Sequence, residues 1–124
     1  MDLLVAQFKW VMLVGGLLTM SMIQAAIAPR MAFRMMFGAE PSGPLALLLA
    51  RNWGVLIFLT GSMLVWGAFH AEVRPLVLLV AGGSKLTFIA LVLSHPPFRK
   101  KAMFALVVDG LLVGLFAAYL VATL

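Results

Sequence analysis

The chain has 124 residues, of which 65% are hydrophobic and only 10% are charged, whereas soluble domains carry about 25% charged residues. Too few polar side chains remain to cover a surface that faces water, so lipid is the solvent that fits this composition. The absence of cysteine excludes disulfides, thiolate metal sites and cysteine nucleophiles. The net charge is +5, and most of the charged residues lie at segment ends, which argues for control of membrane topology and against nucleic-acid binding.

Four apolar stretches are long enough to cross a bilayer, which takes about 20 residues at a rise of about 1.5 Å each. We predict transmembrane helices over residues 10–28, 45–69, 75–93 and 102–124, with room for the first to extend toward Leu3. The expected fold is all-α: one domain, residues 1–124, forming a bundle of four transmembrane helices. Its loops are short, so neighbours in sequence should be antiparallel neighbours in space.

Prolines mark the ends of these predicted helices. Pro29 follows the first helix, while Pro44 and Pro75 suit the first turns of the second and third. The third helix should stop at Pro96 and Pro97, because neither has an N–H to donate and Pro97 disfavours a helical conformation at Pro96.

A short basic segment, residues 30–37, joins the first two predicted spans. Arg30 and Arg34 lie one helical turn apart among apolar residues. This pattern predicts a short helix that lies at the lipid headgroups.

The distribution of lysine and arginine predicts the orientation in the membrane. The loops after the first and third helices carry Arg30, Arg34, Arg99, Lys100 and Lys101. The opposite side carries only Lys9 and Arg74. Because positive charge is retained inside, we expect both basic loops in the cytoplasm and both termini outside an inner, or cytoplasmic, membrane. An aromatic belt that includes Trp66 and Tyr119 would then mark the outer interface.

Polar residues also fall inside the predicted helices, at one level. Lys85 lies about eight residues before the turn between the last two helices, and Asp109 lies about eight residues after it, so both sit roughly 12 Å deep. Opposite charges at one depth on adjacent helices are positioned to pair. Each helix contributes polar groups to this half of the bundle, and the predicted polar layer is Arg51, Asn52, Lys85, Asp109, Gln24 and Ser21.

Two interpretations of this layer remain open. A lysine, arginine or aspartate at the membrane centre costs about 2.5–3.5 kcal/mol, so pairing or a water-filled cavity is expected. In the first interpretation a Lys85–Asp109 bridge orients two helices while Arg51 extends to the headgroups. In the second, the surplus positive charge of Arg51 and Lys85 over Asp109 receives an anionic headgroup or a carboxylate.

Small residues recur along two of the helices and predict close packing. On the second helix the seam is Gly54, Gly61 and Ala68. On the fourth helix the stripe is Gly110, Gly114 and Ala118. Such residues let two backbones approach closely, either within the bundle or between protomers.

The chain shows no catalytic constellation. His70 and His95 fall at opposite ends of the predicted bundle, and no acidic pair has catalytic spacing. We therefore expect no enzyme activity, no metal and no cofactor.

The segment Arg51-Asn52-Trp53-Gly54 places an arginine, an aromatic residue and a glycine near the start of the second helix. Together with the hydropathy layout over most of the chain, it resembles small four-helix membrane proteins related to the ergosterol-biosynthesis scaffold. The resemblance implies a non-catalytic membrane scaffold that gathers lipid-processing enzymes, and it extends residue by residue only to Arg51, Trp53 and Gly54.

We expect a non-enzymatic accessory or scaffold protein whose partners are membrane lipids and other membrane proteins or a second copy of itself. Its polar layer would hold a lipid headgroup. The alternative is a small oligomeric transporter that works around Arg51, Lys85 and Asp109.

Overall fold

The computed structural model describes residues 2–123 and contains no strand within them. Four helical stretches are long and apolar enough to span a membrane, over Leu3–Ile27, Gly43–Ala68, Ala71–Leu93 and Met103–Thr123. The predictions of an all-α chain and of four such stretches are confirmed. Met1 and Leu124, the ends of the predicted domain, lie outside the described residues.

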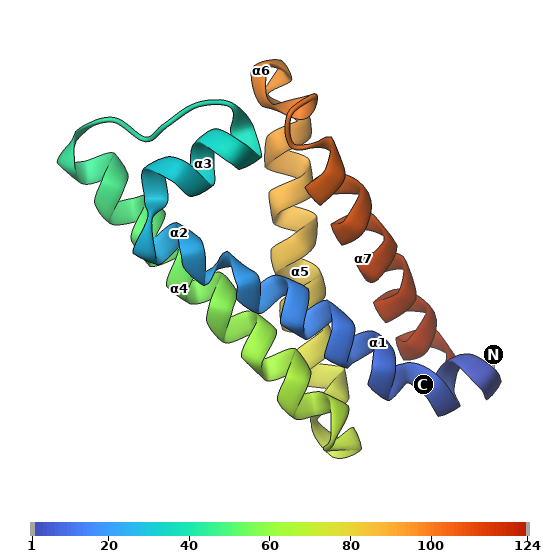
Figure 1. Cartoon of the computed structure of the whole chain (residues 1–124). Coiled ribbons are helices and arrows are strands. Elements are labelled where there is room, and N and C mark those ends of the chain that lie inside the picture. Colours follow the sequence, from blue (N-terminus) through green and yellow to red (C-terminus); the bar gives the residue numbers. More distant parts are fainter. Residues whose placement is uncertain (1, 124) are drawn as a thin grey trace.

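The elements follow one another as helices joined by short turns. In chain order they are α1 (Asp2–Met20), the 3-10 turn η1 (Ser21–Ile23), α2 (Gln24–Ile27), α3 (Pro29–Phe37), α4 (Gly43–Ala68), the 3-10 turn η2 (Ala71–Val73), α5 (Arg74–Leu93), α6 (Pro96–Arg99) and α7 (Met103–Thr123). Helix α1 packs along α4, and α5 packs beside α7 (Figure 1). Helices α3 and α6 lie at one end, here called the α3–α6 end, and the two chain termini lie toward the other, the terminal end.

The first helix extends toward the N-terminus beyond residue 10, as the sequence allowed. The structure continues α1 back to Asp2, through the charge at Lys9. The Lys9 ammonium lies 4.8 Å from the centroid of the Phe69 ring and 5.5 Å from that of Trp10. A cation that rests on aromatic rings is stabilised there, so it does not end the helix.

The predicted short helix after the first span is present as α3. Ala28, with φ −135° and ψ 71°, interrupts the helical backbone between α2 and α3, and Pro29 occupies the first turn. The helix ends at Gly38, whose φ of +74° is a conformation that L side chains rarely adopt. The chain therefore turns and lays α3 across the α3–α6 end instead of prolonging α1 and α2 (Figure 1).

The third helix ends where the sequence predicted, but the conformation of the two prolines after it was predicted wrongly. Helix α5 ends at Leu93, and His95 is non-helical with φ −121° and ψ 87°. Pro96 and Pro97, expected to be non-helical, instead open the one-turn helix α6. Proline fits a first helical turn because the N–H that it lacks has no partner there.

The glycine seam of α4 brings its backbone into contact with α1. A Cβ atom on Gly61 would lie 2.6 Å from the Met20 amide nitrogen and 2.7 Å from the Gly16 carbonyl oxygen. Gly54 and Ala68 on the same seam are also buried. The predicted close packing of this seam occurs within the chain.

The second small-residue stripe is not used in the same way. A Cβ on Gly110 or Gly114 would meet no atom within 4 Å, and both glycines are exposed on α7. Neither glycine therefore makes a close contact within the described part of the chain.

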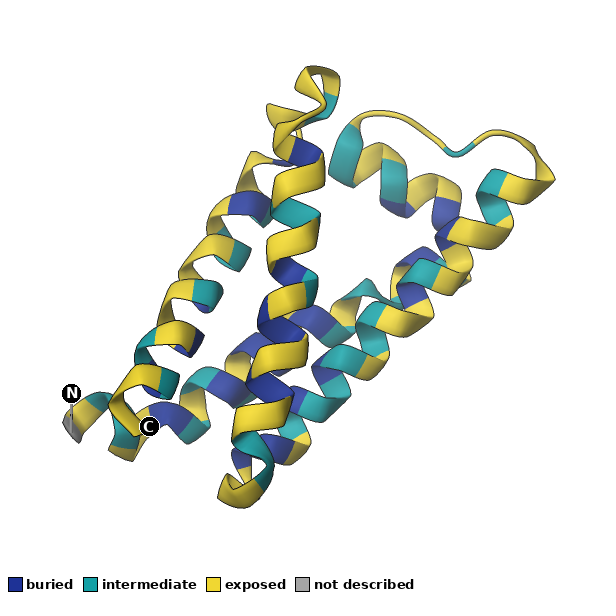
Figure 2. Cartoon of the chain, turned by 180° about the vertical axis from the view of Figure 1, so that it is seen from behind, coloured by how far each residue is buried: buried dark blue, intermediate teal, exposed yellow. Residues whose placement is uncertain are grey.

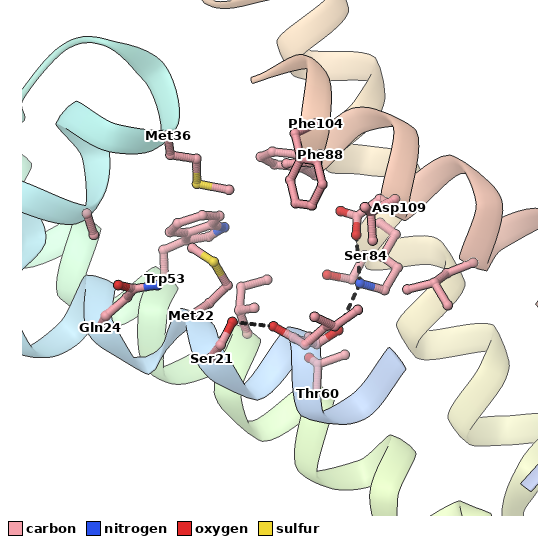
Figure 3. A pocket seen from close by; sticks show the side chains of 18 of the residues that line it. Ser21, Met22, Gln24, Met36, Trp53, Thr60, Ser84, Phe88, Phe104 and Asp109 are labelled. Carbon is pink, nitrogen blue, oxygen red and sulfur yellow. Dashed lines mark hydrogen bonds and ion pairs between the residues drawn. The ribbon is translucent and has the colours of Figure 1, made fainter. Parts of the chain in front are cut away.

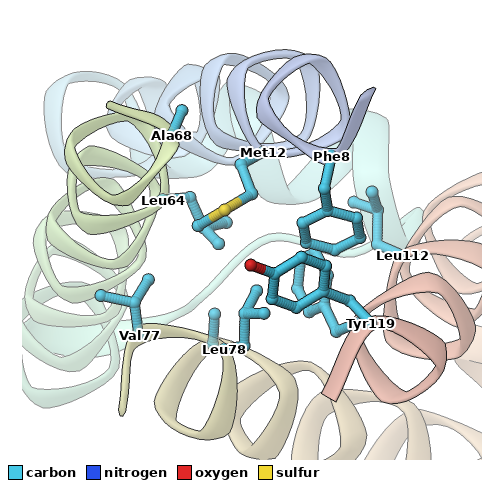
Figure 4. Close-up of a cluster of buried hydrophobic side chains, with 10 residues drawn as sticks. Phe8, Met12, Leu64, Ala68, Val77, Leu78, Leu112 and Tyr119 are labelled. Atoms are coloured by element: carbon cyan, nitrogen blue, oxygen red, sulfur yellow. The ribbon is translucent and has the colours of Figure 1, made fainter. Parts of the chain in front are cut away.

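The hydrophobic core fills the half of the bundle toward the terminal end. Its largest fully buried side chains are Phe8, Phe116, Met12, Leu64 and Leu78 (Figure 4). The buried residues of this cluster come from α1, α4, α5 and α7. The outer faces of the helices are exposed (Figure 2), and many of their exposed side chains are large and apolar. An apolar exterior is what helices in lipid require.

Tyr119, predicted in an interfacial aromatic belt, is instead part of this core. Its residue is 6% exposed, and its ring stacks on Phe8 with centroids 4.2 Å apart. Its hydroxyl accepts a hydrogen bond of 3.2 Å from Arg74, which also donates to the Gly67 and Ala68 carbonyls at the end of α4. Arg74 thus caps a helix, because a cation is favoured beside the last carbonyls.

The α1–α4 contact predicts that replacing Gly61 and replacing Gly114 affect stability differently. Gly61→Ala should lower the free energy of unfolding by about 1–3 kcal/mol, because backbone atoms that meet the new methyl group have no rotamer to relax into. Gly114→Ala on the open face should be neutral or stabilise by up to about 1 kcal/mol through helix propensity. Reversible unfolding in mild detergent measures both variants, and equal effects would contradict the packing described.

Candidate functional site

A buried ion pair joins α5 to α7. The Lys85 Nζ atom lies 3.0 Å from Asp109 Oδ1, and the two side chains are 8% and 20% exposed. Each residue belongs to the buried stripe of its helix, because Ala81 precedes Lys85 and Leu112 follows Asp109 by about one turn. The pair predicted from the sequence is thus present in the structure.

Thr19 of α1 is the third member of this network. Lys85 Nζ donates to Thr19 Oγ1 at 3.0 Å, and that hydroxyl donates in turn to the Gly15 carbonyl oxygen at 2.7 Å. The network therefore links α1, α5 and α7 and uses two of the three N–H donors of the lysine. Sequence reasoning missed Thr19, although its place one turn after Gly15 on the small-residue face of α1 was a usable signal.

A cavity of about 380 Å³ lies beside the ion pair. Trp53 and Met36 stand on one side of it, and Phe104 and Asp109 stand on the other (Figure 3). Its walls are mainly aliphatic, aromatic and methionine side chains. The polar groups in the lining are Thr19, Ser21, Gln24, Thr60, Ser84, Lys85 and Asp109.

The mouth of this cavity opens on the side of the bundle. The lining residues that are exposed are Leu18, Ser21, Gln24, Met35 and Phe104. They come from α1, η1, α2, α3 and α7, whereas every lining residue from α4 and α5 is buried or half-buried. The mouth therefore lies between the α1–α3 segment and α7, and α4 and α5 form the back wall.

The cavity is closed toward the terminal end. Leu112 lines it on that side and belongs at the same time to the core cluster that contains Phe8 and Phe116. Toward the α3–α6 end, the rings of Trp53 and Phe88 stack with centroids 6.2 Å apart. Both rings also line a second hollow of about 540 Å³ under α3 and α6, so they form the wall between the two spaces.

The predicted polar layer is brought together only in part. Ser21, Gln24, Lys85 and Asp109 all line the cavity, but Arg51 and Asn52 are exposed and lie outside the lining. These two residues therefore do not converge on the cavity with the other four.

The reason is the rotation of α4 about its axis. Trp53 faces the cavity, and a residue two positions away on an α-helix points about 200° away from it. Arg51 therefore faces outward, as the first interpretation of the sequence expected. Of the other residues in the segment Arg51-Asn52-Trp53-Gly54, Trp53 lines the cavity and Gly54 packs against Ala25 and Ala26 of α2.

The position of Arg51 changes the electrostatics of the site. Among the described residues, the charged groups in the lining are Lys85 and Asp109 alone, and they balance each other. The surplus of positive charge that the second interpretation required is therefore absent from the lining. Within residues 2–123, no group of three or more histidine, aspartate or glutamate residues is placed to hold a metal ion.

No family model, curated protein or solved structure matches this chain. The resemblance to the ergosterol-biosynthesis scaffold proteins therefore stays a prediction, and the geometry of the cavity carries the functional argument.

The buried pair predicts an asymmetry between single and double variants. Asp109→Ala should lower the free energy of unfolding by about 3–5 kcal/mol, because it leaves the Lys85 ammonium buried without a counter-charge. Lys85→Met combined with Asp109→Leu should be neutral or stabilising, because both charges leave and the volume is roughly kept.

An exposed ion pair supplies the control for this measurement. Arg34 and Glu40 lie 3.6 Å apart with side chains 62% and 44% exposed, so Glu40→Ala should cost less than about 1 kcal/mol. Unfolding in mild detergent compares the three proteins. A cost for Asp109→Ala no larger than that for Glu40→Ala would show that the inner pair is not buried.

Proposed function

We propose that this chain is a non-enzymatic, multi-pass membrane protein that binds one lipid-like molecule in the cavity beside Lys85 and Asp109. The cavity is the observation that supports this most. It is concave and mainly apolar, and its polar groups include Lys85, Asp109 and the Thr19 hydroxyl that Lys85 contacts. Sites for small molecules have this character and occupy roughly 300–1,000 Å³, a range that includes the about 380 Å³ of this one.

The side mouth favours a ligand that comes from the bilayer. Both α1 and α7, which flank the mouth, belong to stretches long and apolar enough to span a membrane. When they do, the opening faces acyl chains and a lipid reaches it without crossing water. The rim fits this environment, because Met35 and Phe104 are 68% and 81% exposed.

The proposal includes an orientation in an inner, or cytoplasmic, membrane. The four long helices cross it as antiparallel neighbours, with the α3–α6 end in the cytoplasm and both termini outside. The basic residues support this, because five of them lie in the loops at the α3–α6 end against Lys9 and Arg74 toward the other. The cavity then opens to the cytoplasmic leaflet.

A scaffold role fits such a site. A protein that holds one lipid within the leaflet can present it to membrane enzymes that process lipids, as the resemblance of Arg51, Trp53 and Gly54 implies. The lining supplies hydroxyls, one amide and one ion pair, which are groups that bind and orient a ligand.

A small transporter is the second candidate. The cavity is open on one side and closed by Leu112 and the core on the other, which is the arrangement of one state in an alternating-access cycle. Transport also needs a second state, open toward the terminal end. Flux of labelled lipid or solute across proteoliposomes, abolished by Asp109→Asn, would favour transport over a scaffold.

Filling the cavity should expel its ligand. Ala105 lines the cavity on α7, whereas Ala117 lies on the exposed face of the same helix. Native mass spectrometry after extraction in mild detergent should find one lipid on the unmodified protein and on Ala117→Trp, and none on Ala105→Trp. Equal lipid occupancy in all three proteins would refute binding in this cavity.

The orientation can be tested with single cysteines, because the chain has none of its own. Ser42, in the turn before α4, and Glu72, in η2, are both exposed. A membrane-impermeant maleimide added to intact cells should label Glu72→Cys, and should label Ser42→Cys only after the membrane is opened. The reverse pattern would place the termini in the cytoplasm.

A further inference from the structure

We infer that the ligand is an uncharged lipid with a free hydroxyl group, of the diacylglycerol kind, and that it enters sideways from the cytoplasmic leaflet. This inference rests on the proposed lipid-binding function and names the ligand class of that same cavity.

The charge balance of the lining selects an uncharged headgroup. Lys85 and Asp109 neutralise each other at 3.0 Å, and Arg51 points away from the cavity. A phosphate or ammonium headgroup would bring in a net charge with no fixed counter-charge in the lining, and an uncompensated charge in an apolar site is costly. The arginines and lysines of the loops are not among the lining residues.

The hydrogen-bonding capacity of the pair selects a hydroxyl. Lys85 donates to Thr19 and to Asp109 Oδ1, which leaves one N–H donor of its ammonium. The Asp109 carboxylate, 20% exposed, has a second oxygen that accepts only. A hydroxyl both accepts and donates, so one such group satisfies the lysine and the aspartate together. An ester, ether or quinone oxygen only accepts, and it would leave the carboxylate without a donor.

A second polar group, the Ser84 hydroxyl, is available to the ligand beside the ion pair. Ser84 lines the cavity on the helix of Lys85, and Figure 3 shows it next to Asp109. Its hydroxyl is placed to donate to an ester carbonyl of a glycerolipid whose free hydroxyl meets the ion pair. A glycerol backbone carries both kinds of group within a few bonds of each other.

The acyl chains of the ligand can extend through the mouth into the bilayer. Leu18, Met35 and Phe104 form the exposed apolar rim, and Met22 and Met36 line the space behind it. Methionine side chains adapt to irregular shapes, so they suit acyl chains of different length and unsaturation. Because the chains continue into the bilayer, a cavity of about 380 Å³ has to hold only the headgroup and the first chain segments.

The route of entry follows from the walls. The stacked rings of Trp53 and Phe88 separate the cavity from the hollow under α3, and Leu112 closes the terminal side. The exposed lining residues place the mouth between the α1–α3 segment and α7. In the proposed orientation this mouth faces lipid, so the ligand enters there.

The test compares three lipids that differ only at the headgroup. The purified protein in phosphatidylcholine nanodiscs is supplied in turn with dioleoylglycerol, with the same lipid acetylated on its free hydroxyl, and with dioleoylphosphatidate. Native mass spectrometry reads the bound lipid. We expect dioleoylglycerol to be preferred over each of the others at least about tenfold, because only its hydroxyl satisfies both members of the pair.

Variants test whether the ion pair recognises the hydroxyl group of the lipid. Lys85→Met with Asp109→Leu should still bind lipid but bind dioleoylglycerol and its acetylated form equally. Ser62→Ala removes a hydroxyl of α4 that bonds the Phe58 carbonyl and lies outside the lining, so it should keep the original preference.

The outcomes distinguish failure of the proposed ligand class from failure of the proposed lipid binding. Equal binding of dioleoylglycerol and its acetylated form by the unmodified protein would overturn the hydroxyl as the recognised group, and a preference for phosphatidate would overturn the uncharged headgroup. Either result leaves lipid binding intact. Binding of none of the three lipids, nor of phosphatidylcholine from the nanodisc, would overturn the proposed function itself. The comparison on the unmodified protein decides the ligand class even if the double variant does not fold.

Discussion

The ion pair between Lys85 and Asp109 is the constraint on which the arrangement of the helices depends. Neither charge is tolerated alone inside an apolar bundle, so α5 and α7 must meet at the level where the two residues face each other. Thr19 brings α1 to the same point by accepting from the lysine. Helix α4 is held differently, through direct backbone contact of Gly61 with α1. The cavity lies beside the Lys85–Asp109–Thr19 network, and α4 lines it with Trp53, Ile57 and Thr60.

Counting along the helices predicted the depth of each polar residue but not its direction, and this explains what the sequence could and could not reveal. Lys85 and Asp109 were predictable as a pair because two opposite charges at one depth have few ways to be satisfied in lipid. Arg51 has the same depth, yet the rotation of α4 turns it outward, and that rotation is set by how the glycine seam meets α1. Thr19 carries no charge, so only its place one turn after Gly15 could have indicated that it belongs to this network. The shape of the cavity depends on all helices at once and has no signature in any single segment.

The outward position of Arg51 also changes what the site can recognise. With the arginine included, the layer would attract anions; without it, the lining is neutral and offers a donor and an acceptor side by side. The Lys85–Asp109 pair is thus consistent with both interpretations of the sequence, a bridge between helices and a binding site. It fixes two helices relative to each other, and its remaining hydrogen-bonding groups face the cavity. A structural bridge and the binding site that we propose are therefore compatible with each other.

The central claim is that one lipid occupies the cavity with its headgroup at the ion pair. An experimental structure of the protein, crystallised from a lipidic phase without delipidation, tests this claim most directly. The account predicts elongated density that enters between α3 and α7 and ends within hydrogen-bonding distance of Lys85 Nζ and Asp109. A cavity filled only by water, or closed by contact of Trp53 with Phe104, would contradict it.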